Sequence, residues 1–135
     1  MIHTISPGFF CGPSVIEAIT GEDMLSVILP ALNRASRAEY LLDEVIESRI
    51  PDMLHVLVEL GYRVGEYKHN AAYLGDVGSW HNKFFDYVIM LFTMEHVLVV
   101  HEGMAYDNHT PMGCPALTHP FTKVKVVSAY IVRKM

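Results

Sequence analysis

A cysteine stands at the beginning of an expected helix, in the run Cys11-Gly12-Pro13. Pro13 suits the first helical turn, because the N–H group that proline lacks would have no partner there. The backbone N–H groups of a helix start and the positive end of its dipole both favour a thiolate over a thiol. Because the thiolate is the nucleophilic form of cysteine, the sequence predicts a reactive thiol at Cys11.

An expected hairpin further along the chain carries a histidine and an acidic residue. Residues 96–101 and 104–108 have the apolar, β-branched pattern of two strands, and Glu102-Gly103 between them predicts a tight turn. If this turn has two residues, Asp107 lies on the same face of the sheet as His96, one diagonal step away. A bulge at the turn would place Asn108 there instead, because a shift of one residue moves every side chain to the other face.

A nucleophilic cysteine usually needs a base, and the base needs a group that orients it. We therefore predict that His96 takes the proton of Cys11 and that Asp107 orients the imidazole, with Asn108 as the alternative third residue. The same residues also fit a structural interpretation, in which Cys11 is a buried core residue and Asp107 only ends a strand.

The order and setting of these residues resemble the papain-like cysteine peptidases, particularly short bacterial and phage-type members similar to the C39 peptidases. The resemblance spans roughly residues 8–133 and depends on short motifs: Cys11-Gly12-Pro13, His96 opening a strand, Gly103, Tyr106-Asp107, and Gly61-Tyr62-Arg63-Val64 after a helix. It implies a papain-like α+β fold, in which an N-terminal helical half packs on a C-terminal antiparallel sheet. It also implies a cysteine peptidase or thiol amidohydrolase that acts on a peptide or protein substrate and requires no cofactor.

One position departs from the family pattern. Family enzymes usually carry a glutamine about six residues before the nucleophile, and its amide helps to stabilise the tetrahedral oxyanion. Residues 1–8 contain neither glutamine nor asparagine, so His3, Thr4 and Ser6 are the candidate side-chain donors there. Because the loss of one such donor costs about 100-fold or more in rate, the alternative function is a papain-like binding or inhibitor protein with a weakened site.

Five residues with side chains that bind zinc fall close together in the sequence: His101, Asp107, His109, Cys114 and His119. Their spacing is irregular and no paired cysteine motif is present, so we expect no metal site. Cys114 stands in an expected loop without a helix start, which makes it a poor nucleophile. A disulfide between Cys114 and Cys11 would bury the proposed nucleophile, and we expect both cysteines to be reduced.

Composition limits the class of protein. The 135-residue chain has a formal net charge of −5 and a pI near 5.8, and its ten lysines and arginines are dispersed, so we expect no nucleic-acid partner. Apolar runs such as residues 87–92 are too short to span a bilayer, and the first residues lack the basic segment of a signal peptide, so we expect no membrane partner. We expect one cytoplasmic domain over residues 1–135, in the host cytoplasm if a phage encodes it.

The elements that must position these residues follow in an order typical of an α+β domain. Apolar periodicity and capping residues predict helices from Cys11, over residues 24–33 with Thr20 and Asp23 as a capping pair, over 40–46 and over 52–60. Strands are expected from Tyr62 and over residues 87–92, 96–101, 104–107 and 123–132, with a long loop over 108–122. A short helix from Ser79 carries Trp80, a weak candidate for substrate binding.

Overall fold

The structure, a computed structural model, describes residues 2–6, 11–36, 50–66, 87–93, 96–119 and 125–135. In this part of the chain the helices come first: α1 (Cys11–Thr20), the π-helical segment η1 (Met24–Ile28), α2 (Leu29–Ser36) and α3 (Ile50–Glu59). The strands follow, with one short 3-10 helix among them: β1 (Tyr62–Glu66), β2 (Val88–Phe92), β3 (Val97–His101), β4 (Met104–Tyr106), β5 (Cys114–Pro115), η4 (Ala116–Thr118) and β6 (Ser128–Lys134). The predicted order, helices before strands, is confirmed for these residues.

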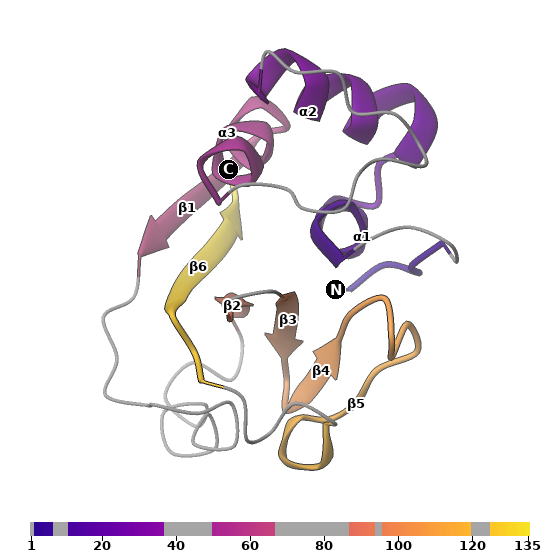
Figure 1. Cartoon of the computed structure of the whole chain (residues 1–135), viewed down its shortest axis with the longest axis vertical. Coiled ribbons are helices and arrows are strands. Elements are labelled where there is room, and N and C mark those ends of the chain that lie inside the picture. Colours follow the sequence, from indigo (N-terminus) through magenta and orange to yellow (C-terminus); the bar gives the residue numbers. More distant parts are fainter. Residues whose placement is uncertain (1, 7–10, 37–49, 67–86, 94–95, 120–124) are drawn as a thin grey trace.

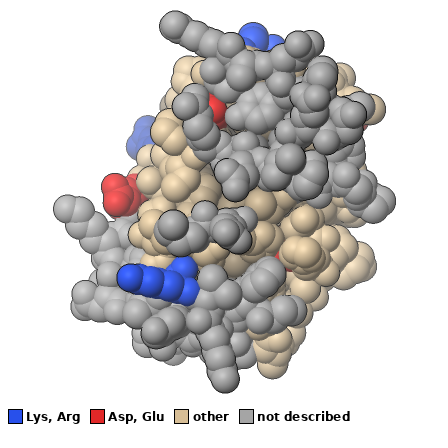
Figure 2. All heavy atoms as spheres, viewed as in Figure 1, with Lys and Arg blue, Asp and Glu red and all other residues tan. Residues whose placement is uncertain are grey.

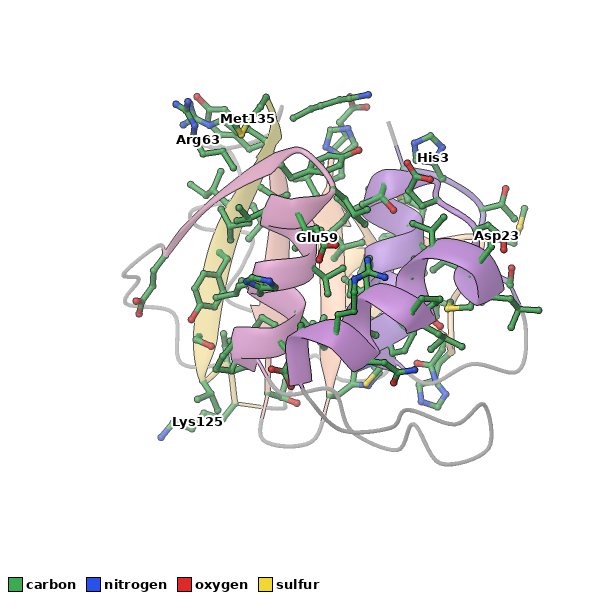
Figure 3. All side chains as sticks on the ribbon, turned by 90° about the horizontal axis from the view of Figure 1, so that it is seen from above. His3, Asp23, Glu59, Arg63, Lys125 and Met135 are labelled. Atoms are coloured by element: carbon green, nitrogen blue, oxygen red, sulfur yellow. The ribbon has the colours of Figure 1, made fainter. Side chains whose placement is uncertain are left out.

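The described strands form one open sheet in the spatial order β1-β6-β2-β3-β4-β5, and every neighbouring pair is antiparallel. The helices are grouped on one side of this sheet (Figures 1 and 3). Helix α1 packs on β3, and α3 packs on β1. The architecture is therefore mixed helix and antiparallel sheet, as expected for the α+β class.

Both faces of the central strands β2 and β3 are buried, which explains their uninterrupted apolar runs. Along β3, Val97 and Val99 belong to the cluster that includes the helices, whereas Leu98 and Val100 belong to a second cluster on the opposite face. Successive side chains of a strand point to opposite faces. A strand covered on both sides therefore needs an apolar residue at every position.

Single residues fix the ends of the first helices. Helix α1 begins at Cys11, as predicted. Thr20 is not the N-cap of the next helix: its hydroxyl donates to the carbonyl of Ile16 (2.8 Å) in α1 and accepts from the N–H of Glu22 (3.2 Å), which precedes η1. Asp23 is the N-cap of η1, where its carboxylate accepts from the backbone N–H of Ser26 (2.9 Å). The predicted capping pair is therefore wrong for Thr20 and correct for Asp23.

The hairpin has the predicted two-residue turn. Strands β3 and β4 pair so that Val100 faces Ala105. The turn residues Glu102 and Gly103 both have positive φ angles, 50° and 81°, as the type I′ turn of a twisted hairpin requires. The register that determines the position of Asp107 is therefore the predicted one.

Other elements differ from those expected. The helix expected over residues 24–33 is divided into η1 and α2, and the last strand begins at Ser128. The expected loop over residues 108–122 contains β5, whose Cys114 pairs with Ala105 of β4. The helix expected over residues 40–46 and the helix from Ser79 lie outside the described residues.

Charged groups are dispersed over the surface of the described residues. Their basic side chains occupy several separate places on the face shown in Figure 2. One exposed ion pair, between Arg34 and Glu59 (2.7 Å), joins α2 to α3. In the ranges that the structure describes, no helix has the length and apolar character needed to cross a membrane.

Candidate functional site

The beginning of α1 and the beginning of β3 bring Cys11 and His96 together. Cys11 is the first residue of α1, and His96 directly precedes β3, on which α1 packs. The thiol of Cys11 is hydrogen-bonded to the His96 side chain and to the backbone N–H groups of Gly12 and Val97. The sulfur is therefore held by groups from both the helix and the strand.

His96 in turn contacts Asp107, which follows β4. His96 Nε2 lies 2.7 Å from Asp107 Oδ2. The His96 side chain is 12% exposed and the Asp107 side chain is fully buried. Because an ionised carboxylate only accepts hydrogen bonds, Nε2 carries a hydrogen and Nδ1 is the nitrogen left to face the thiol. Asp107 thus fixes the tautomer in which His96 can take a proton from Cys11.

Cys11 and His96 shift each other's pKa in opposite directions. Burial raises the pKa of Cys11, but hydrogen bonds from His96 and Val97 and the charge of His96 outweigh it, so the pKa lies below its ordinary 9.0. Burial lowers the pKa of His96, but hydrogen bonds with Asp107 and Cys11 and their charges raise it from 6.5 to about 9. Each group favours the charged form of the other, which is the state of a thiolate beside an imidazolium.

Asp107 is fixed by the turn that follows β4. Its Oδ1 accepts from the backbone N–H of His109 (2.9 Å) and from the N–H (2.8 Å) and hydroxyl (2.9 Å) of Thr110. Burial raises the pKa of this carboxyl, but hydrogen bonds from His96 and Thr110 and the charge of His119 hold the pKa well below its usual range. Asp107 is therefore ionised at neutral pH.

A second imidazole, which the sequence did not place in the site, also reaches Asp107. His119 Nε2 lies 2.8 Å from Asp107 Oδ2, and both side chains are fully buried. Pairing of β5 with β4 returns the chain to the hairpin, and η4 then turns it so that the His119 N–H donates to the Ala116 carbonyl (3.3 Å). The one sequence signal was the cluster of zinc-type residues that contains both Asp107 and His119.

The alternative third residue is placed differently from Asp107. Asn108 Oδ1 is buried and has no hydrogen-bond partner among the described residues. The residue bonded to His96 is Asp107 and not Asn108, because the turn has no bulge that would exchange them. Trp80, the candidate for substrate binding, lies outside the described residues.

Cys114 is a contrasting thiol in the same region. Neither cysteine is in a disulfide. Burial and the charge of Asp107 raise the pKa of Cys114, although a hydrogen bond with Thr110 opposes them. Of the two cysteines, Cys11 is therefore the one whose surroundings favour the thiolate.

Of the five zinc-type residues, Asp107 contacts His119 and the backbone N–H of His109, whereas His101 lies apart from them. His101 lies with its Nδ1 3.3 Å from the carbonyl of Tyr87, at the far end of β3 from His96. Among the residues that the structure describes, no three His, Cys, Asp or Glu side chains are grouped in a way that could hold a metal ion.

Ser6 and Thr4 were two of the candidate oxyanion donors. The Ser6 hydroxyl donates to Glu17 Oε2 (2.7 Å), and the Ser6 N–H donates to the other oxygen of the same carboxylate. Thr4 is exposed. The hydroxyl of Ser6 thus already donates its hydrogen to a buried carboxylate of α1.

His3, the third candidate donor, lies at the opposite end of the sheet from the thiol. Figure 3 shows His3 at the end where β6 leads to Met135, with Lys125 at the other end. Strand β3 runs in the same direction as β6, because both are antiparallel to β2. His96 directly precedes β3 and so lies at the Lys125 end, together with Cys11. The geometry thus argues against His3 and Ser6 as oxyanion donors, and Thr4 and the backbone N–H of Cys11 remain.

No protein-family model matches the chain, and no curated protein matches it.

Proposed function

We propose that the protein is a cysteine-dependent hydrolase of papain-like type that cleaves a peptide or another amide bond. The observation that carries the proposal is the continuous chain of contacts from the Cys11 thiol through His96 to the fully buried carboxylate of Asp107. A nucleophile, its base and an orienting group are thus within hydrogen-bond reach of one another. The helical half that precedes an antiparallel sheet is compatible with the papain-like resemblance.

In the first half of the reaction, the Cys11 thiolate attacks the carbonyl carbon of the scissile amide. A carbon–sulfur bond forms and the carbonyl oxygen becomes an oxyanion, which the backbone N–H of Cys11 helps to stabilise. The imidazolium of His96 then gives its Nδ1 proton to the amide nitrogen. The carbon–nitrogen bond breaks, an amine leaves, and the acyl group remains on Cys11.

In the second half, water replaces the amine. Neutral His96 takes a proton from the water at Nδ1, and the resulting hydroxide attacks the thioester carbon. The carbon–sulfur bond breaks, which releases the acid and restores the thiolate beside the imidazolium. Asp107 keeps its charge throughout and holds Nε2–H of His96, so the same imidazole nitrogen serves both half-reactions.

Alkylation with iodoacetamide over a range of pH tests the thiolate–imidazolium pair. We expect Cys11 to react at pH values well below its ordinary pKa of 9.0, because the imidazolium stabilises its thiolate. The advantage should disappear in His96→Ala. Cys114 serves as an internal control, since burial and Asp107 raise its pKa. Peptide mass spectrometry measures the two cysteines in the same sample.

Acylation tests the reaction itself. We expect p-nitrophenyl acetate to leave an acetyl group on Cys11 that intact-mass measurement detects in the wild type and not in Cys11→Ser. Cleavage of fluorescently labelled casein should likewise be lost in Cys11→Ser. An inert Cys11, or a Cys11 that titrates like Cys114 both in the wild type and in His96→Ala, would refute the proposal.

A binding or inhibitor protein with a weakened site is the second candidate. It is favoured by the engagement of Ser6 with Glu17 and by the position of His3 at the far end of the sheet. This candidate predicts an alkylated Cys11 without acyl-enzyme or turnover. It also predicts that Cys11→Ala leaves partner binding unchanged.

A further inference from the structure

We propose that His119 is a positioning residue that shares the Asp107 carboxylate with His96 and thereby limits how strongly Asp107 stabilises the His96 imidazolium. The inference rests on the proposed function, because it concerns the strength of His96 as an acid in that reaction. His119 contacts Asp107 and so acts on His96 through that carboxylate.

The geometry divides the Asp107 carboxylate into two halves. Oδ1 accepts three hydrogen bonds from the turn residues His109 and Thr110. Oδ2 accepts from both imidazoles, at 2.7 Å from His96 Nε2 and 2.8 Å from His119 Nε2. Because the ionised carboxylate has no hydrogen to give, both Nε2 atoms must carry one. His119 is thus a donor that competes with His96 for a single oxygen.

This competition weakens the stabilisation of the His96 imidazolium by Asp107. A second donor at Oδ2 draws part of the negative charge of Asp107 toward itself, so less of it stabilises the imidazolium of His96. Burial strengthens the effect, because the side chains of Asp107 and His119 are fully buried and no water screens them. An acid works best when its pKa is close to the working pH, so a weaker hold on the proton favours its transfer to the leaving amine.

Several ionisable groups face this pair from the elements around it. They are Cys11 from α1, His109 with its ring centroid 5.5 Å from that of His96, and Cys114 of β5 near Asp107. Two imidazoles, those of His96 and His119, share the charge of Oδ2.

An NMR titration of the imidazole signals tests the role of His119. We expect the pKa of His96 to rise above its wild-type value by about half a unit or more in His119→Leu, since Asp107 then serves His96 alone. His119→Gln keeps an N–H donor of similar reach and should restore the wild-type value. A merely structural His119 would lower the unfolding midpoint in both variants and leave the pKa of His96 unchanged. The assignment of the His96 signal comes from its absence in His96→Asn.

A measurement on the wild type keeps the test independent of whether the variants fold. Long-range ¹H–¹⁵N spectra report which ring nitrogen carries hydrogen, and we expect it on His119 Nε2. An unprotonated His119 Nε2, or an unchanged or lowered His96 pKa in folded His119→Leu, would overturn the inference. Failure of the proposed function is seen separately, as an inert Cys11 in the alkylation experiment.

Discussion

Asp107 carries out two tasks with its two oxygens. Oδ1 closes the turn after β4 through His109 and Thr110, while Oδ2 holds the imidazoles of His96 and His119. The interpretation of Asp107 as a residue that ends a strand and its interpretation as an orienting group are therefore both consistent with the structure. The turn fixes the carboxylate, and the fixed carboxylate then fixes the imidazole.

Removal of this carboxylate should be costly. We expect Asp107→Ala to lower the free energy of unfolding by about 3–5 kcal/mol, because it leaves buried donors without their acceptor. It should also abolish the reactivity of Cys11 at low pH, since the pKa of His96 falls when the Asp107 charge is lost. Urea unfolding and the alkylation profile measure the two effects.

The neighbouring asparagine provides the matched control. We expect Asn108→Ala to change the free energy of unfolding by about 1 kcal/mol or less, because it removes a buried acceptor that has no partner among the described residues. The alkylation profile of Cys11 should stay that of the wild type. If Asn108→Ala suppressed Cys11 reactivity as strongly as Asp107→Ala, the assignment of Asp107 would be wrong.

Local rules could predict one side of the Asp107 environment and not the other. The pairing with His96 follows from a two-residue turn at Glu102 and Gly103 and from the alternation of side chains along two strands. His119 comes after an irregular path whose side-chain directions have no period, so its arrival at the same oxygen depends on tertiary packing. The positions of the oxyanion candidates likewise depend on tertiary packing, because the His3 ring lies against Gly21 and the Ser6 hydroxyl donates to Glu17.

At the scale of elements, the return of β5 to β4 determines where His119 lies. The chain reaches β5 through a turn in which the Gly113 N–H donates to the Thr110 carbonyl (2.9 Å). Gly113 has a φ angle of +83°, and a Cβ atom there would lie 2.5 Å from Cε1 of Tyr106 in β4. The turn thus depends on a residue without a side chain.

We expect Gly113→Ala to lower the free energy of unfolding by about 2–4 kcal/mol, from the left-handed backbone and from the clash with Tyr106 together. Thermal or urea unfolding measures this loss. A stability equal to that of the wild type would show that the turn can rearrange without cost.

Gly61 separates the two contributions. It has a φ angle of +94°, but a Cβ atom there meets nothing within 4 Å. Gly61→Ala should therefore cost only the backbone contribution, about 1–2 kcal/mol. Equal losses in the two variants would remove the clash with Tyr106 from the explanation.

The elements differ in how far sequence patterns define them. Strands β2 and β3 were expected because their apolar runs are long, and α1 because Pro13 and the apolar residues after it suit a helix. The two residues of β5 are too few to produce a pattern, and Pro115 argues against a strand. The π-helical segment η1 escaped detection because its apolar spacing is also that of an α-helix.

At the scale of the whole molecule, the candidate site joins the helical and the sheet-forming parts of the chain. Cys11 comes from α1, whereas His96 and Asp107 come from the β3–β4 hairpin and His119 from the segment after β5. The site is therefore complete only when α1 is packed on β3. The composition and order of elements predicted such a two-part domain, but only the packing brings the thiol to the imidazole.

The buried carboxylate should make stability depend on acid. The folded pKa of Asp107 lies below its ordinary value of 3.8, so its contribution is present above 3.8 and is lost as the pH falls through the folded pKa. We expect the difference in unfolding free energy between the wild type and Asp107→Asn to be largest near neutral pH and to shrink below about pH 4. Urea unfolding at several pH values measures it.

Asp23→Asn is the control for this acid dependence. The Asp23 carboxylate is exposed and caps η1, so solvent screens its charge and the corresponding difference should be much smaller. A difference for Asp107→Asn that stays constant from pH 7 to pH 2 would contradict the lowered pKa of Asp107.

The opposite pKa shifts of Cys11 and His96 also determine how many protons folding exchanges with water. Between pH 6.5 and about 9 the unfolded chain keeps one proton on this pair, on sulfur. Where Cys11 is ionised in that range, the folded pair also keeps one, on nitrogen. Folding then relocates a proton inside the molecule and releases none, so the contribution of the pair is independent of pH there. In calorimetry, its heat should not vary with the ionisation enthalpy of the buffer.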